Sequence, residues 1–99
     1  MSSVNFKYGE DKIVAELQEY LDSTYAGHYV AGGDQIQTFD IWNALDVAGP
    51  VCQGTAIKYL MRYGRKAGFN KKDLLKAMHY IILLWHYTQE EQTDNDKDV

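Results

Sequence analysis

The segment from residue 71 to 88 constrains the fold of this chain more than any other segment. At helical spacing, its apolar side chains cover well over half of the circumference of a helix. They are Leu74, Leu75, Ala77, Met78, Ile81, Ile82, Leu84 and Trp85. A helix that is apolar nearly all round lies at the centre of a bundle or at a subunit interface. The sequence therefore predicts a homo-oligomer that associates through this helix.

Three further segments have the apolar spacing of amphipathic helices, and no segment has a strong strand pattern. Gly27 and the run from Ala48 to Pro50 are expected to end the first two helices, because glycine and proline interrupt helices. Asn70 is expected to cap the fourth helix. The predicted fold class is all-α, a small bundle of about four helices. These helices are expected at residues 10–25, 35–47, 51–66 and 71–88.

The chain has 99 residues, a length typical of one domain. We expect a flexible N-terminal arm at residues 1–9 and a single helical domain at residues 10–88. Residues 89–99 are acidic and polar, which predicts a disordered tail.

The composition limits the cellular compartments and the classes of partner that we expect for this chain. The net charge of −4 disfavours binding to bulk nucleic acid or to an anionic membrane, because the summed field repels polyanions. Cys52 is the only cysteine, which excludes an internal disulfide and is typical of a reducing cytosol. The longest strongly apolar run, residues 80–85, is far shorter than the ~20 residues that span a bilayer. We expect a cytoplasmic protein with no membrane partner.

Positive charge is concentrated in one stretch of this acidic chain. Seven of the ten Lys and Arg residues lie between residues 58 and 76, where Asp73 is the only acid. That stretch carries about +6 (seven minus one), so the remainder carries about −10 to give the net charge of −4. Crowded like charges repel each other and are retained either because water screens them or because an anion binds there. A solvated helix face and a local anion site are therefore the two interpretations.

Four of these cations have the spacing of one helical face. They are Lys58, Arg62, Arg65 and Lys66. Arginine forks match pairs of phosphate oxygens, and charge-assisted bonds to them are strong. Tyr59 and Tyr63 flank the face and offer flat surfaces on which a base can stack. This pattern favours a phosphate-bearing ligand.

Other polar residues are weaker candidates. His28 and Tyr29 precede paired glycines in the loop GHYVAGG, where the backbone can approach a ligand closely. Asp40 lies among apolar residues, and we expect a partly buried acid that either pairs with a cation of the third helix or contacts the ligand. His79 and His86 share a face but lack an acid or cysteine at ligand spacing, so no metal site is expected.

The order of these residues resembles a known family over residues 28–85. The carrying features are His28-Tyr29, Gly33, Asp40, the run GTAIKYLMRYGRK at residues 54–66, and DL.KA..Y from Asp73 to Tyr80. It is similar to a family of small bacteriophage proteins of unknown function whose members are often labelled nucleotide kinase. The chain departs from the family pattern at Gln37, where the family usually has Glu, and at Thr55, where it often has Asn. The resemblance implies a nucleotide ligand and a phage protein in the host cytoplasm.

Three functions follow as hypotheses. The first is a phage protein that sequesters a nucleotide signal, expected to be cyclic, as an anti-defence sponge that needs no cofactor. The second is a kinase of deoxynucleoside monophosphates, which requires Mg²⁺ and ATP. The third is a helical adaptor that binds a host protein through residues 71–88. The expected ligand-binding residues are His28, Tyr29, Asp40, Thr55, Lys58, Tyr59, Arg62, Arg65 and Lys66.

Overall fold

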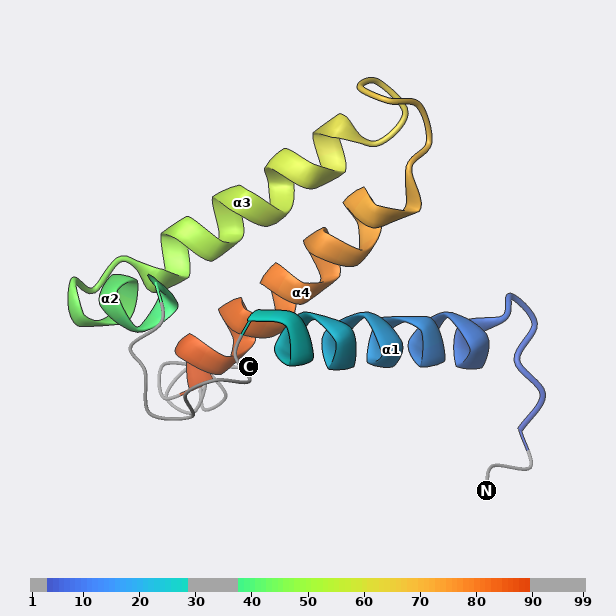
Figure 1. Ribbon diagram of the computed structural model, residues 1–99, viewed down its shortest axis with the longest axis horizontal. Coiled ribbons are helices and arrows are strands. Elements are labelled where there is room, and N and C mark those ends of the chain that lie inside the picture. The colour runs from blue at the N-terminus through green and yellow to red at the C-terminus, as the bar shows by residue number, and fades with distance from the viewer. Residues whose placement is uncertain (1–3, 29–37, 90–99) are drawn as a thin grey trace, which may run out of the picture. The chain divides into compact units, whose positions relative to one another are not determined.

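A computed structural model describes residues 4–28 and 38–89 of the chain. The described residues form four helices and no strand, which confirms the predicted all-α bundle (Figure 1). The chain divides into two compact units, Met1–Asp34 and Gln35–Val99. The helices are α1 (Glu10–His28) in the first unit, and α2 (Thr38–Ala44), α3 (Ala48–Arg62) and α4 (Lys71–Tyr87) in the second. The expected arm, single domain and tail stay predictions.

Helix α1 begins as the sequence indicates and ends later. Gly9 has a positive φ of 72°, and its carbonyl accepts a 3.0 Å bond from the Ile13 N–H. The Glu10 carboxylate accepts a 2.9 Å bond from the Tyr8 N–H just before the helix. The predicted end at Gly27 is wrong, because the helix continues to His28. A glycine in a helix costs only about 1 kcal/mol relative to alanine, so it does not force an end.

Helix α2 is shorter than predicted, and the following boundary is misplaced in the sequence-based prediction. The helix covers Thr38–Ala44, while the predicted residues 35–37 lie outside the described ranges. Asp46 has a positive φ of 63°, which turns the chain directly into α3. Pro50 is the third residue of α3 and does not end a helix. In the first turn the missing N–H has no intrahelical partner to lose, so proline is tolerated there.

Helix α3 ends four residues earlier than predicted, at Arg62. Gly64 has a φ of 83° and donates a 2.9 Å bond to the Gly68 carbonyl, which closes a tight loop. The N–H groups of Arg65 and Lys66 both donate to the Arg62 carbonyl, at 2.9 and 3.0 Å. Arg65 and Lys66 therefore belong to the loop, and the prediction of four cations on one helical face is wrong.

Helix α4 matches its prediction closely. Asn70 caps it, because its side-chain oxygen accepts a 3.0 Å bond from the Lys72 N–H. Asp73 follows in the first turn, where the helix dipole favours an acid. At the other end the Thr88 hydroxyl donates a 2.8 Å bond to the Leu84 carbonyl. The helix therefore spans one residue less than the predicted segment.

Small residues let α3 and α4 pack closely as an antiparallel hairpin (Figure 1). On α3, Ala48, Cys52 and Ala56 recur every four residues and are buried. Ala77 on α4 is also buried, with 1% of its surface exposed. Phe39 fixes α2 to this hairpin, since its ring makes an edge contact with Tyr80 of α4 at 5.9 Å between centroids. The hairpin with α2 is the frame of the second unit.

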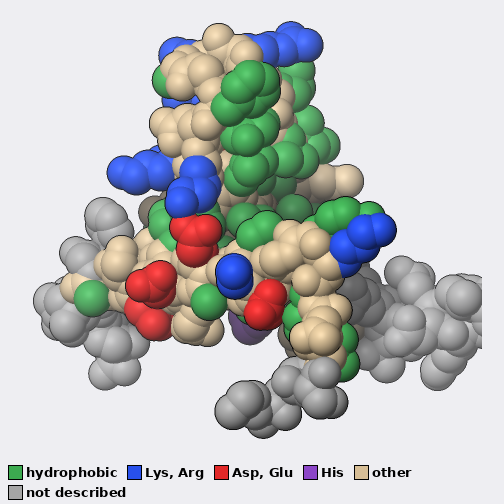
Figure 2. Space-filling model, turned by 90° about the vertical axis from the view of Figure 1, so that its right-hand side faces the viewer, with side chains coloured by type: hydrophobic (Ala, Val, Ile, Leu, Met, Phe, Trp, Pro, Cys, Tyr) green, Lys and Arg blue, Asp and Glu red, His purple; other side chains and the backbone are tan. Residues whose placement is uncertain are grey.

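Large apolar side chains also remain on the surface of the hairpin. In Figure 2 a column of hydrophobic side chains runs up the hairpin, with Lys and Arg side chains beside it. The exposed residues are Ile57, Leu60 and Met61 on α3 and Ile81, Ile82 and Trp85 on α4. In residues 4–28 and 38–89, no helix combines the length and apolar character needed to cross a bilayer.

Gly64 provides a test of the loop that ends α3. A β-carbon at this position would lie 2.6 Å from Phe69 Cε1 and would sit on a backbone with positive φ. We expect Gly64→Ala to lower the free energy of unfolding by about 1–2 kcal/mol, because L-residues are strained in the left-handed region. Gly54→Ala is the matched control in the interior of α3, where an added β-carbon meets nothing within 4 Å. It should raise stability by about 0.5–1 kcal/mol in urea denaturation; equal effects of the two changes would contradict the loop geometry.

Candidate functional site

Three cations from two helices surround one aromatic ring in the hairpin. The Lys58 ammonium nitrogen lies 4.7 Å from the centre of the Tyr59 ring, and the Arg62 Cζ lies 5.6 Å from it. Lys76 of α4 brings its ammonium nitrogen to 5.4 Å from the same centre. Each distance is within the range of a cation–π contact. We call Lys58, Tyr59, Arg62 and Lys76 the Tyr59 cluster.

A row of aromatic rings leads away from this cluster. Tyr59 stacks on Tyr80, with 6.1 Å between centroids and 23° between ring planes. Tyr80 contacts Phe39, which in turn makes an edge contact with Trp42 at 5.4 Å. All four rings are partly exposed. In the second unit, a row of aromatic rings therefore begins at the Tyr59 cluster and extends onto α2.

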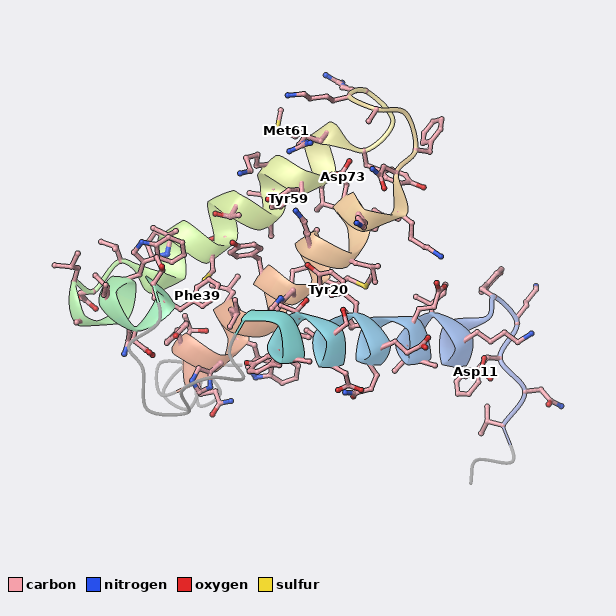
Figure 3. The ribbon with its side chains drawn as sticks, in the orientation of Figure 1. Asp11, Tyr20, Phe39, Tyr59, Met61 and Asp73 are labelled. Atoms are coloured by element: carbon pink, nitrogen blue, oxygen red, sulfur yellow. The ribbon has the colours of Figure 1, made fainter. Side chains whose placement is uncertain are left out.

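Among the described residues of the second unit, the acid that pairs with the cluster is Asp73, which lies between α3 and α4 together with Tyr59 (Figure 3). Its Oδ1 is 3.7 Å from the Arg62 Nε, an ion pair that is too long for a hydrogen bond. The Asp73 side chain is 6% exposed and the Arg62 side chain is 40% exposed. Asp73 Oδ2 and Arg62 Nε are buried and form no hydrogen bond to any described residue. The pair is thus buried at the carboxylate end and open to water along part of the arginine.

The charge balance of this region is strongly positive. Asp73 is the only acid between Asp46 and Glu90, a stretch that contains seven Lys and Arg residues. One buried carboxylate, paired with Arg62, is therefore the only acid in the stretch that supplies the three cations of the cluster. The quadrupole of the Tyr59 ring offsets part of their mutual repulsion, since each cation–π contact contributes about 0.5–1 kcal/mol at exposed sites. The remaining field favours an anion at this place.

The structure brings together only part of the predicted site. Lys58, Tyr59 and Arg62 lie in the cluster, whereas Arg65 and Lys66 are exposed residues of the following loop. Tyr63 caps the C-terminal end of α3 and places its ring against Phe69, not along the cationic face. The cause is Gly64, whose left-handed backbone redirects the chain one turn before the predicted helix end.

Two predicted polar residues have surroundings that differ from the expectation. Asp40 is exposed on the short helix α2, so the expectation of a partly buried acid is wrong. The buried acid that pairs with a cation of α3 is Asp73. Thr55 is partly buried, and its hydroxyl donates a 2.7 Å bond to the Val51 carbonyl of its own helix. Its oxygen can still accept a bond, but its proton is already used.

His28 and Tyr29 are not brought to the cluster by any described contact. His28 is the last residue of α1 and belongs to the first unit. Tyr29 and the glycines that follow it lie outside the described residues. Their contribution to a ligand site stays a prediction.

Three other groups with potential chemistry are not members of the cluster. Cys52 is fully buried, and burial raises the pKa of its thiol, which keeps the thiol protonated. Burial lowers the pKa of His79, which favours the neutral ring. His86 is exposed and packs its ring on Tyr87. Among the residues that the structure describes, no three His, Cys, Asp or Glu side chains gather as a potential metal site.

One family model matches residues 23–82, which include all of α2 and α3 and most of α4. Its description is that of a protein of unknown function, DUF3310. The chain belongs to the DUF3310 family. The whole Tyr59 cluster and Asp73 lie inside the matched region. Neither a curated protein nor a solved structure matches the chain.

Sequence reasoning missed Lys76 and Asp73 as site residues of this DUF3310 protein. Both lie on α4 and reach the cluster across the hairpin, which helical spacing along α3 does not reveal. A signal was present, because a single acid within a long cationic stretch has several cations from which to find a partner. The spacing of three between Asp73 and Lys76 also places them on neighbouring turns of one face.

The ion pair gives Arg62 a structural role, and Arg65, an exposed arginine of the following loop, serves as the control. Arg62→Ala leaves the buried Asp73 carboxylate without its counter-charge. Because Arg62 is 40% exposed, we discount the full cost of a broken buried pair and expect a loss of about 1–2 kcal/mol in the free energy of unfolding. Arg65→Ala should change it by less than about 0.5 kcal/mol. Urea denaturation measures both variants, and equal stabilities would show that the pair contributes nothing.

Proposed function

We propose that this DUF3310 protein binds a nucleotide through its phosphate groups and holds it without chemical change. The observation that supports the proposal most is the convergence of Lys58, Arg62 and Lys76 on one ring. Three cations gathered around one ring offer a phosphate several charge-assisted bonds at once. Arg62 adds the planar fork that suits phosphate oxygens, and the two lysines act as point charges.

The aromatic row supports a ligand that carries a base. Tyr59 is already surrounded by three cations and by Tyr80, so little of its ring is left for a base. Phe39 and Trp42 lie further along the row and are partly exposed. Aromatic faces of this kind accept any base by stacking, at about 1–3 kcal/mol per base. In the proposal, the phosphate lies at the Tyr59 cluster and the base toward α2.

The biological role that we propose is sequestration of a nucleotide signal. The chain resembles small phage proteins, and a phage gains from removing a cyclic nucleotide that the host uses in immune signalling. Retention of an unchanged ligand requires cations and stacking surfaces, which this unit offers, and no reacting group. Phosphoryl transfer to a deoxynucleoside monophosphate, with ATP and Mg²⁺, is the competing activity for the same site.

The test is a calorimetric titration with a panel of mononucleotides, cyclic nucleotides, cyclic dinucleotides and inorganic pyrophosphate. We expect at least one member to bind, and Lys76→Ala to weaken its binding about 10-fold or more, as the loss of a charge-assisted bond predicts. Lys12→Ala is the matched control, because it removes the same charge from exposed Lys12 on α1. Absence of binding by every member at saturating concentration would refute the proposal, as would equal losses in the two variants.

Recovery of the nucleotide after incubation distinguishes sequestration of the nucleotide from phosphoryl transfer. The protein is incubated with ATP, Mg²⁺ and each monophosphate, and the products are resolved by chromatography. Unchanged nucleotides agree with sequestration, whereas a diphosphate product would replace it with the kinase activity. Pull-down of a host protein that is insensitive to nuclease treatment, without nucleotide binding, would favour an adaptor instead.

We also propose that copies of the protein associate through the apolar surface of α4. Ile81, Ile82 and Trp85 are exposed there, with Trp85 at 61%. Aromatic residues in particular are enriched at the centres of protein interfaces. A homo-oligomer would remove these side chains from water.

Trp85→Ser tests this association. Because Trp85 is mostly exposed, the change removes interface area without opening the core, and we expect a fall from oligomer to monomer at micromolar concentration. Phe69→Ser is the control, since Phe69 is 79% exposed in the loop between α3 and α4. Size-exclusion chromatography with light scattering reports the mass of each. A monomeric wild-type protein would end the idea.

A further inference from the structure

The Arg62–Asp73 pair has a geometry that a surface ion pair lacks. The Nε of Arg62 and the Oδ2 of Asp73 each have almost no contact with water and no hydrogen bond to a described residue. Nevertheless 40% of the Arg62 side chain is exposed. Because Nε is buried, that exposure belongs to other parts of the side chain. The arginine is thus buried at its inner nitrogen, beside the carboxylate, and open to solvent elsewhere.

We propose that Asp73 is a positioning residue that holds the Arg62 guanidinium by its Nε side, so that the two terminal NH₂ groups face an incoming anion. The proposal rests on the proposed phosphate site and extends it to a residue that does not touch the ligand. The carboxylate is 94% buried as a side chain (100 minus the 6% exposed), so the ligand does not reach it. Among the residues that the structure describes, the carboxylate pairs with Arg62, at 3.7 Å between Oδ1 and Nε.

Fixing one side of a guanidinium matters because arginine has a long and flexible stem. An unpaired Arg62 loses rotamer freedom when it binds an anion, and this loss of entropy opposes binding. Asp73 removes part of that freedom before the ligand arrives. Lys58 and Lys76 contact the same ring but form no ion pair with a described acid, so the constraint acts on the cation of the cluster that has a planar fork.

Two simpler roles for Asp73 predict different results. As an acid in the first turn of α4, it stabilises the helix, and that effect does not depend on Arg62. As a negative charge near a cationic site, it repels an anion, so its removal should tighten binding. A positioning role predicts that removal of the Asp73 charge weakens anion binding, and that it does so only while Arg62 is present. The sign of the effect therefore separates the roles.

The experiment is a double-mutant cycle with inorganic pyrophosphate as the probe, measured by calorimetry. We expect Asp73→Asn to weaken pyrophosphate binding about 5-fold, within the range of coupling between residues in contact. In the Arg62→Ala background the same change should produce no weakening. Tighter or unchanged binding in the single variant would overturn the proposal, as would an equal loss in both backgrounds.

A second measurement needs neither a ligand nor a variant of the pair. The chain has two arginines, Arg62 and Arg65, so its spectrum contains two Nε–H signals, which Arg65→Ala assigns. By NMR we expect the Arg62 Nε–H to exchange with water at least about 10-fold more slowly than that of Arg65, as burial of the group predicts. Equal exchange rates would overturn the positioning role. Failure of the wild-type protein to bind pyrophosphate or any nucleotide would instead overturn the proposed function, and the exchange rates would still show whether the Nε side of Arg62 is held in the interior.

Discussion

Close packing of α3 on α4 is the constraint on which the rest of the second unit depends. The buried residues that recur every four positions on α3 are small, as is Ala77 on α4. Small contact residues let helix axes approach each other, and long side chains at the edge of the contact then meet across the two helices. Tyr59 and Lys76 meet in this way although they are 17 positions apart in the sequence (76 minus 59). A larger side chain at Cys52, which has no exposed surface, would separate the helices and the cluster together.

The same packing sets the electrostatics of the hairpin. It buries Asp73 beside Arg62 and leaves Lys58 and Lys76 without an ion pair to any acid that the structure describes. A buried ion pair is weak evidence for stability, because desolvation offsets much of the attraction. Its stronger consequence is geometric, since a buried carboxylate limits the directions that its partner can take. The hairpin therefore holds both the positive charge and the one group that gives part of that charge a fixed direction.

Local signals in the sequence predicted the helices better than the site. Asn70 and the apolar run after it identified α4, because capping and periodicity depend on neighbouring residues. The end of α3 was missed, because Gly64 takes a positive φ inside a run that otherwise continues the helical pattern. Pro50 was misinterpreted for a related reason, since proline suits the first turn of a helix as well as the end of one. Of the predicted cations, the two before Gly64 lie in the cluster and the two after it lie in the loop.

Contacts between α3 and α4 could not be predicted from the sequence pattern, and the reason is physical. Helical spacing gives the neighbours of Lys58 along α3, but the rotation of α4 about its axis decides whether Lys76 or another lysine faces Tyr59. That rotation follows from which side of α4 carries the buried residues Ala77 and Asp73, and a hydrophobicity pattern does not place an acid such as Asp73 in the core. Burial of Asp73 is tolerated because Arg62 supplies a counter-charge and because the first turn of α4 is a favourable place for an acid. In this hairpin the isolated acid of the cationic stretch thus marks the place where α3 and α4 meet, and it pairs there with a cation of the facing helix.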